Sequence, residues 1–164
     1  MAKKSEKKED QKKTLALVFV EGDTEVDFYN KMKEHLRHKL GGKLACEVKI
    51  HNLKGVGQYQ NTAQRIFEKR VKVDYPPEEY RYHIFLCYDT DVFEYAKKPP
   101  VDWPKVIKML KELGAHEVLR VEAKTSIEDW FLLDIEGLRS FLKIPRKVKL
   151  SGYKGQNGLR QLFL

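Results

Sequence analysis

Acidic residues follow two of the most apolar segments of the sequence. The apolar run from Leu15 to Val20 is followed at once by Glu21, within VEGDTE. A second apolar run ends in FLCYDTD, which places Asp89 and Asp91 just past its last apolar residue. Carboxylates packed together repel one another, so a cluster of them normally requires cations. Hard oxygen ligands of this kind select Mg²⁺ or Mn²⁺, and such ions can organise phosphoryl transfer.

Each acidic motif also has a simpler explanation when it is taken alone. Turns and helix caps often supply acids at this spacing, and Thr24 is a good N-cap for a helix with acids in its first turn. A cap explains Thr24 but not Glu21, which makes sense mainly as a partner for Asp89 and Asp91. Because both motifs occur in one chain, each after a strongly apolar segment, they favour a metal site.

The segments around these acids alternate between strand-like and helix-like patterns. Strands are expected over Leu15–Val20, over residues 44–51 and in the segments YHIFLCYD and EVLRVEA. Helices are expected to begin at Thr24, near Tyr59, after Asp102, after Ser126 and after Asp134. This alternation predicts an α/β fold with a largely parallel four-stranded sheet flanked by helices. We expect one domain over residues 14–164, preceded by a disordered basic tail over residues 1–13.

This fold would gather the acidic residues at one edge of the sheet, since ligand sites of open α/β sheets form at the carboxyl ends of their strands. Glu21 follows the first strand, and Asp89 and Asp91 follow the third. Their spacing of two residues in an extended chain would direct both aspartates to the same side. Glu128 follows the fourth strand, at the start of a helix. No Cys and His residues have the spacing of a zinc site.

The charge distribution is compatible with a polyanionic partner such as nucleic acid. The net charge is +8, with six lysines against three acids in residues 1–13 and six basic residues without an acid in residues 143–164. The C-terminal bases that would hold a nucleic-acid backbone are Lys147, Lys149, Lys154 and Arg160. Lysine-rich ends also solubilise a protein, and for the N-terminal tail that explanation is favoured.

Several classes of protein are not indicated by the sequence. No apolar run approaches the roughly 18 residues of a membrane span, and the N-terminus lacks the apolar core of a signal peptide, so a cytosolic protein without membrane contact is expected. Cys46 and Cys87 both fall in expected strands, which favours small buried side chains over a disulfide or metal site.

The combination of motifs resembles the acidic signature of the Toprim fold, which topoisomerases, primases and several nucleases share. The signature is carried by Glu21 and by Asp89-Thr90-Asp91. In detail the chain is similar to the small stand-alone Toprim proteins of the RloB-like and OLD-like (overcoming-lysogenization-defect) groups. That similarity rests on VEGDTEVDFY, on CYDTD and on SIEDWFLLD followed by IEGLRSFL, and runs from about Leu15 to the C-terminus.

The resemblance implies a Toprim-like, Rossmann-like domain that binds Mg²⁺ through Glu21, Asp89 and Asp91. It extends the ligand set to Glu25, the second acid of the E-G-x-T-E motif, and to Glu128. The activity it implies is a metal-dependent nuclease or phosphotransferase that acts on DNA or RNA, in bacterial or phage defence, with a defence-system protein as a second partner. Glu25 could equally favour the helix dipole, and Glu128 could complete the start of its helix.

Two other functions remain open. DTDVF after an apolar strand also fits a haloacid-dehalogenase-type phosphatase, in which Asp89 would be the nucleophile. That motif normally opens its domain, however, and here a complete strand–helix–strand–helix unit precedes it. The second alternative is a non-catalytic module that uses the same fold to bind nucleic acid or a defence partner.

Overall fold

The computed structural model describes residues 12–91 and 101–146, apart from the side chains of residues 141 and 142. Within this part of the chain, four parallel strands form one sheet in the order β2-β1-β3-β4. The strands are β1 (Lys13–Val20), β2 (Glu47–Asn52), β3 (Tyr80–Asp89) and β4 (Glu117–Ala123). The predicted α/β fold with a parallel four-stranded sheet is therefore confirmed, and it is consistent with a Rossmann-like arrangement.

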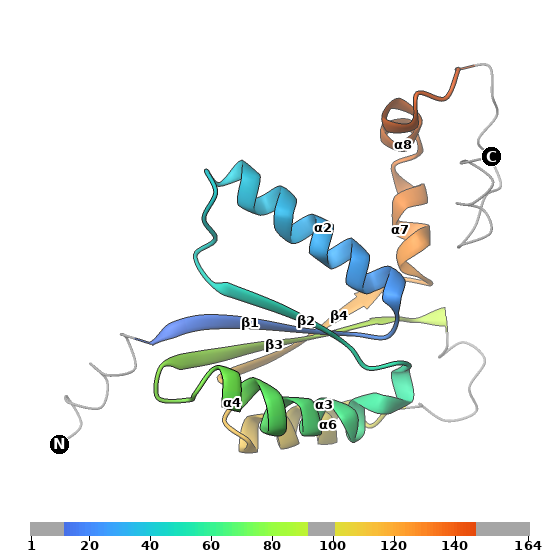
Figure 1. Cartoon of the computed structure of the whole chain (residues 1–164). Coiled ribbons are helices and arrows are strands. Elements are labelled where there is room, and N and C mark those ends of the chain that lie inside the picture. Colours follow the sequence, from blue (N-terminus) through green and yellow to red (C-terminus); the bar gives the residue numbers. More distant parts are fainter. Residues whose placement is uncertain (1–11, 92–100, 147–164) are drawn as a thin grey trace. The chain divides into compact units, whose positions relative to one another are not determined.

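Helices cover both faces of the sheet. They are α2 (Asp23–Lys39), the 3-10 helix η1 (Val56–Gln60), α3 (Thr62–Ile66), the π-helix η2 (Phe67–Val71), α4 (Lys72–Asp74) and α6 (Trp103–Glu112). Two further helices, α7 (Ile127–Leu133) and α8 (Ile135–Leu142), follow β4 in the chain. Figure 1 shows α2 on one face and α3, α4 and α6 on the opposite face. The single helix expected to begin near Tyr59 is thus a succession of short segments with different hydrogen-bond periods.

The strand β1 is central because it pairs on both sides. Val18 lies opposite Ile50 of β2 on one side and opposite Phe85 of β3 on the other. All three strands run in the same direction, so β1 and β3 end at the same edge of the sheet. The continuous apolar run of β1 fits this position, because a central parallel strand is covered on both faces.

The two faces of β1 are covered to different degrees. Towards α3 and α6, Leu15, Leu17 and Phe19 are completely buried. Towards α2, Val18 and Val20 form a cluster with Cys87, and Val26 and Tyr29 of α2 pack against it. No residue of α2 is buried, however. Three large apolar residues of α2, Met32, Leu36 and Leu40, are 40%, 41% and 61% exposed.

Most predicted helix boundaries are confirmed by their caps. The side chain of Asp102 accepts a hydrogen bond from Lys105 N at 3.1 Å, and that of Asp134 accepts one from Gly137 N at 2.9 Å. Gly41 has φ of 74°, a left-handed conformation that suits glycine after a helix. The second strand begins later than expected, at Glu47. No helix among the described residues is long and apolar enough to cross a membrane.

The described residues divide into two compact units. Unit 1 lies within Met1–Cys87 and Pro99–Val121, and unit 2 within Tyr88–Lys98 and Glu122–Leu164. Strands β3 and β4 each begin in unit 1 and end in unit 2. The expected single domain over residues 14–164 stays a prediction.

Candidate metal centre

Glu21 directly follows β1, where the backbone is held by the loop after β2. Leu53 N donates to Val20 O, and Gly55 N donates to Glu21 O, both at 2.8 Å. Gly55 has φ of 115°, which is open to glycine and strained for other residues, so this glycine permits the close turn. The half-buried Glu21 therefore stands on a fixed backbone at the carboxyl end of the central strand.

The helix that follows begins differently from the prediction. Gly22 is the N-cap of α2, and no side chain caps it, so the expected cap by Thr24 is wrong. Asp23 instead accepts a hydrogen bond from Asn52 Nδ2 at 2.7 Å, and Asn52 Oδ1 accepts one from Lys54 N at 2.6 Å. The start of α2 is thus tied to the end of β2, a contact across 29 residues that no local pattern reveals.

Glu25 turns its carboxylate back towards the start of α2. Its Oε2 lies 3.0 Å from the position that a Cβ on Gly22 would occupy. A negative charge in this place is stabilised by the positive end of the helix dipole. The dipole role considered for Glu25 is therefore compatible with its position, and a ligand role remains a prediction.

Tyr59 is a buried residue near these acids, and its sequence pattern indicates only a place in a helix. Its hydroxyl lies 3.2 Å from the carbonyl oxygen of Phe19 and also donates to that of Cys87, which links the ends of β1 and β3. Burial raises the pKa of Tyr59 far above its usual range, and the charges of Glu21 and Glu25 add to the increase. The phenol therefore stays protonated and serves as a hydrogen-bond donor to the backbone.

In unit 2, the DTD segment is held by the end of β4. Thr90 N donates to Ala123 O and Asp91 N to Thr125 O, both at 3.0 Å, while Thr90 Oγ1 accepts from Thr125 N at 2.8 Å. The extended chain ends at Asp89, and Asp91 already has a helical backbone. The expectation of an extended chain across both aspartates is therefore wrong, and both aspartates are half-buried on either side of a bend at Thr90.

Glu128 lies in the first turn of α7 and is half-buried. The cap of this helix is made by its neighbours: Ser126 Oγ accepts from Asp129 N at 3.3 Å and donates to Asp129 Oδ2 at 2.8 Å. Because Ser126 and Asp129 satisfy each other, the helix does not need Glu128 for its cap. The prediction that Ser126 opens this helix is confirmed, because Ser126 is its N-cap.

The candidate acids divide between the two units. Glu21 and Glu25 belong to unit 1, and Asp89, Asp91 and Glu128 to unit 2. Among residues 12–91 and 101–146, no three His, Cys, Asp or Glu side chains form a group that could hold a metal ion. The donor chemistry fits Mg²⁺ or Mn²⁺, since every candidate is a carboxylate on a backbone fixed by hydrogen bonds. The expected nucleic-acid contacts Lys147, Lys149, Lys154 and Arg160 lie outside the described residues.

No protein-family model, curated protein or solved structure matches the chain. The Toprim resemblance therefore rests on the sequence motifs alone, and the structure adds the parallel sheet on which these motifs stand.

Proposed function

We propose that the protein is a Mg²⁺-dependent, Toprim-like nuclease or phosphotransferase that acts on nucleic-acid phosphodiesters. The observation that carries the proposal is the position of the acids on the sheet. Glu21 follows β1, and Asp89 ends β3, the strand that pairs with β1 in parallel. Ligands of open α/β sheets bind beyond the carboxyl ends of such strands. The RloB-like or OLD-like resemblance, the defence role and the cytosolic location belong to the same proposal.

In this proposal Glu21, Asp89 and Asp91 hold the metal ion. A bound Mg²⁺ supplies positive charge beside a phosphodiester. Glu25 and Glu128 either complete the carboxylate set or accept a proton from the attacking water or hydroxyl. Tyr59 keeps the backbone carbonyls next to Glu21 in place, since its hydroxyl contacts Phe19 and Cys87.

The basic C-terminal segment holds the nucleic-acid backbone in the same proposal. The logarithm of the affinity for duplex DNA falls linearly with the logarithm of the salt concentration. Each cation that neutralises a phosphate makes this slope steeper by about 0.9. Replacing Lys147 or Lys149 by Gln should therefore lower this slope by nearly one. Unchanged slopes in both variants would remove these lysines from the interface.

A cleavage assay on single- and double-stranded DNA and RNA with Mg²⁺ or Mn²⁺ tests the activity. Asp89→Asn and Glu21→Gln should abolish cleavage, because each removes a carboxylate charge while it keeps the shape of the side chain. Asp27→Asn is the matched control, since Asp27 is an exposed acid of α2 outside the candidate set. Nucleic-acid binding without cleavage under all conditions would instead support a non-catalytic module. A trapped acyl-phosphate at Asp89 would support the phosphatase alternative.

A further inference from the structure

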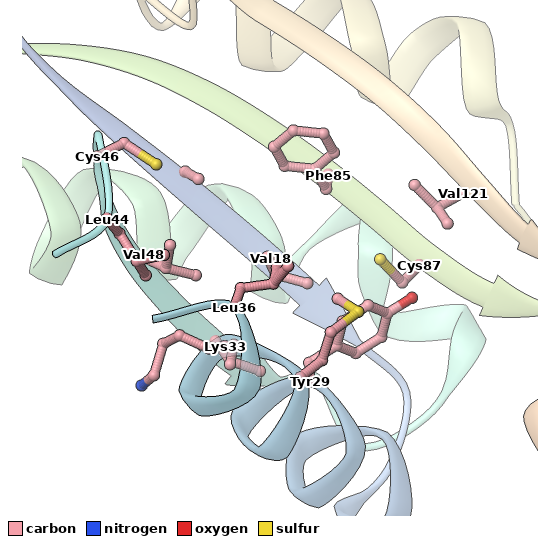
Figure 2. Close-up of a pocket in the computed structure, with 13 residues that line it drawn as sticks. Val18, Tyr29, Lys33, Leu36, Leu44, Cys46, Val48, Phe85, Cys87 and Val121 are labelled. Atoms are coloured by element: carbon pink, nitrogen blue, oxygen red, sulfur yellow. The ribbon is translucent and has the colours of Figure 1, made fainter. Parts of the chain in front are cut away.

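A cavity of about 390 Å³ lies between α2 and the sheet, wholly within unit 1. Tyr29 and Leu36 line it from the helix, and Val18, Val48, Phe85 and Cys87 line it from three strands. Figure 2 shows these side chains directed towards one another, while the nitrogen of Lys33 points away from Phe85 and Cys87. The walls of the cavity are therefore apolar, with a cation at its margin.

The cavity exists because α2 covers its face of the sheet incompletely. Met32 and Leu36 point to this face and remain 40% and 41% exposed. On the opposite face, Phe67 and Tyr82 pack edge to face at 5.1 Å and are almost completely buried. A space of this volume falls within the usual range for small-molecule pockets, about 300–1,000 Å³. An apolar occupant would remove the exposed side chains of α2 from water.

A second hollow of about 350 Å³ adjoins the first and is polar. The two hollows share the lining residues Lys33, Leu44, Cys46 and Val48, so they lie next to each other. We call the three cations on the α2 side of the second hollow, Lys33, Arg37 and Lys43, the basic rim. Lys49 also lines this hollow, but its ammonium lies over the ring of Tyr75 at 5.3 Å.

Acidic neighbours offset the basic rim only in part. Glu34 lies 3.6 Å from Arg37 and 4.0 Å from Lys33, on the exposed surface of α2. Exposed pairs of this kind contribute only about 0–1 kcal/mol. Glu47 also lines the hollow. An anionic group that arrives with an apolar chain can therefore replace Glu34 as the partner of these cations.

We propose that unit 1 binds an anionic amphiphile in this joint cavity. Its apolar chain fills the space under α2, and its carboxylate or phosphate group is held by the basic rim. The apolar walls exclude a purely ionic ligand such as inorganic phosphate, and the basic rim discriminates against a cationic amphiphile. This ligand site goes beyond the proposed nuclease activity and uses none of its acids.

Calorimetric titration of the full chain with four probes tests the proposal: decanoate, decyl phosphate, decyltrimethylammonium and inorganic phosphate. The two anionic decyl probes should bind, and the cationic probe should bind at least about tenfold more weakly, because it lacks charge-assisted hydrogen bonds to the basic rim. Inorganic phosphate should not bind measurably. Failure of both anionic decyl probes to bind, or equal binding of the cationic one, would overturn the proposal.

Variants locate the site. Two substitutions should each weaken the binding of decyl phosphate by about tenfold. Ala16→Phe fills the cavity from β1, and Arg37→Gln removes a cation of the basic rim. Lys31→Gln is the matched control, because Lys31 is exposed on α2 and lines neither hollow. If Ala16→Phe does not fold, Leu36→Gln serves as the cavity variant. Unchanged affinity in the cavity and rim variants would refute the assignment, as would a dimer that Leu36→Gln dissociates.

A thiol measurement gives an independent readout. Cys46 is half-buried and lines both hollows. Bound decyl phosphate should therefore slow the alkylation of Cys46 by N-ethylmaleimide, whereas inorganic phosphate should not. Equal alkylation rates with and without a saturating anionic probe would place the probe elsewhere.

Discussion

At the scale of single residues, a small group of buried polar atoms lies close to Glu21. Tyr59 reaches the carbonyl oxygens of Phe19 and Cys87, and the field of Glu21 and Glu25 extends to its hydroxyl. Each buried donor in this group has an acceptor, which keeps the cost of its burial low. The backbone that carries Glu21 is thus supported from within the protein as well as by the loop after β2.

Cys87 gives this group a measurable dependence on pH. Burial raises the pKa of the thiol from 9.0 to about 11; Glu25 adds to the increase, and a hydrogen bond with Tyr29 opposes it. The folded protein therefore holds this proton where the unfolded chain has lost it, and the free energy of unfolding falls as the pH rises through this window. We expect Cys87 to account for a loss of about 2–3 kcal/mol.

Urea unfolding between about pH 8 and pH 11, followed by circular dichroism, measures this loss. Cys87→Ala should be less sensitive to pH over that window, because the variant has no thiol to titrate there. Tyr82, whose pKa burial raises to about 12, contributes equally to both proteins. Identical pH profiles for the two proteins would contradict the assignment.

At the scale of elements, the candidate acids stand on connections that are tied to neighbouring strands. Asp23 joins the start of α2 to the end of β2 through Asn52. Thr90 and Asp91 follow the end of β4 through Ala123 and Thr125. These contacts fix the turns after β1 and β3.

The connection between β4 and α7 carries backbone strain that a substitution can relieve. Thr125 has φ of 68°, a left-handed conformation that costs a residue with a Cβ roughly 1–2 kcal/mol. Thr125→Gly keeps both backbone hydrogen bonds and should raise the free energy of unfolding by about 1 kcal/mol, measured in urea. Thr125→Ala is the control, because it keeps the Cβ and hence the strain. A glycine variant no more stable than the alanine variant would disprove this explanation.

At the scale of the whole molecule, the sheet of unit 1 has one tightly packed face and one loosely packed face. Phe67 is completely buried against the sheet, whereas Leu36 of α2 is 41% exposed. Phe67→Ala should lower the free energy of unfolding by about 3–5 kcal/mol, since it leaves a cavity in a packed core. Leu36→Ala should lower the free energy of unfolding by less than about 1 kcal/mol, because Leu36 is partly exposed and alanine favours the helix. Urea unfolding of both variants measures the difference, and similar costs would show that α2 is packed as tightly as the opposite face.

The architecture could be predicted because the signals for it are local. The apolar run of β1, the alternation of elements and the caps at Asp102, Ser126 and Asp134 can all be read within a few residues. The start of α2 could not be predicted in the same way. Thr24 has the right chemistry for a cap, but the partner that holds this turn is Asn52, far along the chain.

The details of the candidate site depended on similarly distant contacts. The bend at Thr90 follows from hydrogen bonds to Ala123 and Thr125, more than 30 residues later, so an extended DTD segment was a natural but wrong expectation. Tyr59 looked like an ordinary residue of an amphipathic helix. Only the pairing of β1 with β3 places the two carbonyl oxygens that its hydroxyl contacts.

Binding of a divalent cation by Glu21 and the two aspartates can be measured as Mn²⁺ binding, followed by electron paramagnetic resonance. The full chain should bind Mn²⁺, and Asp89→Asn should weaken that binding by at least about tenfold, since it removes a charged ligand. The control Asp27→Asn should bind as the unmodified chain does. If Asp89→Asn and Glu21→Gln bind Mn²⁺ as tightly as the unmodified chain, or if the unmodified chain binds none, the metal site is contradicted.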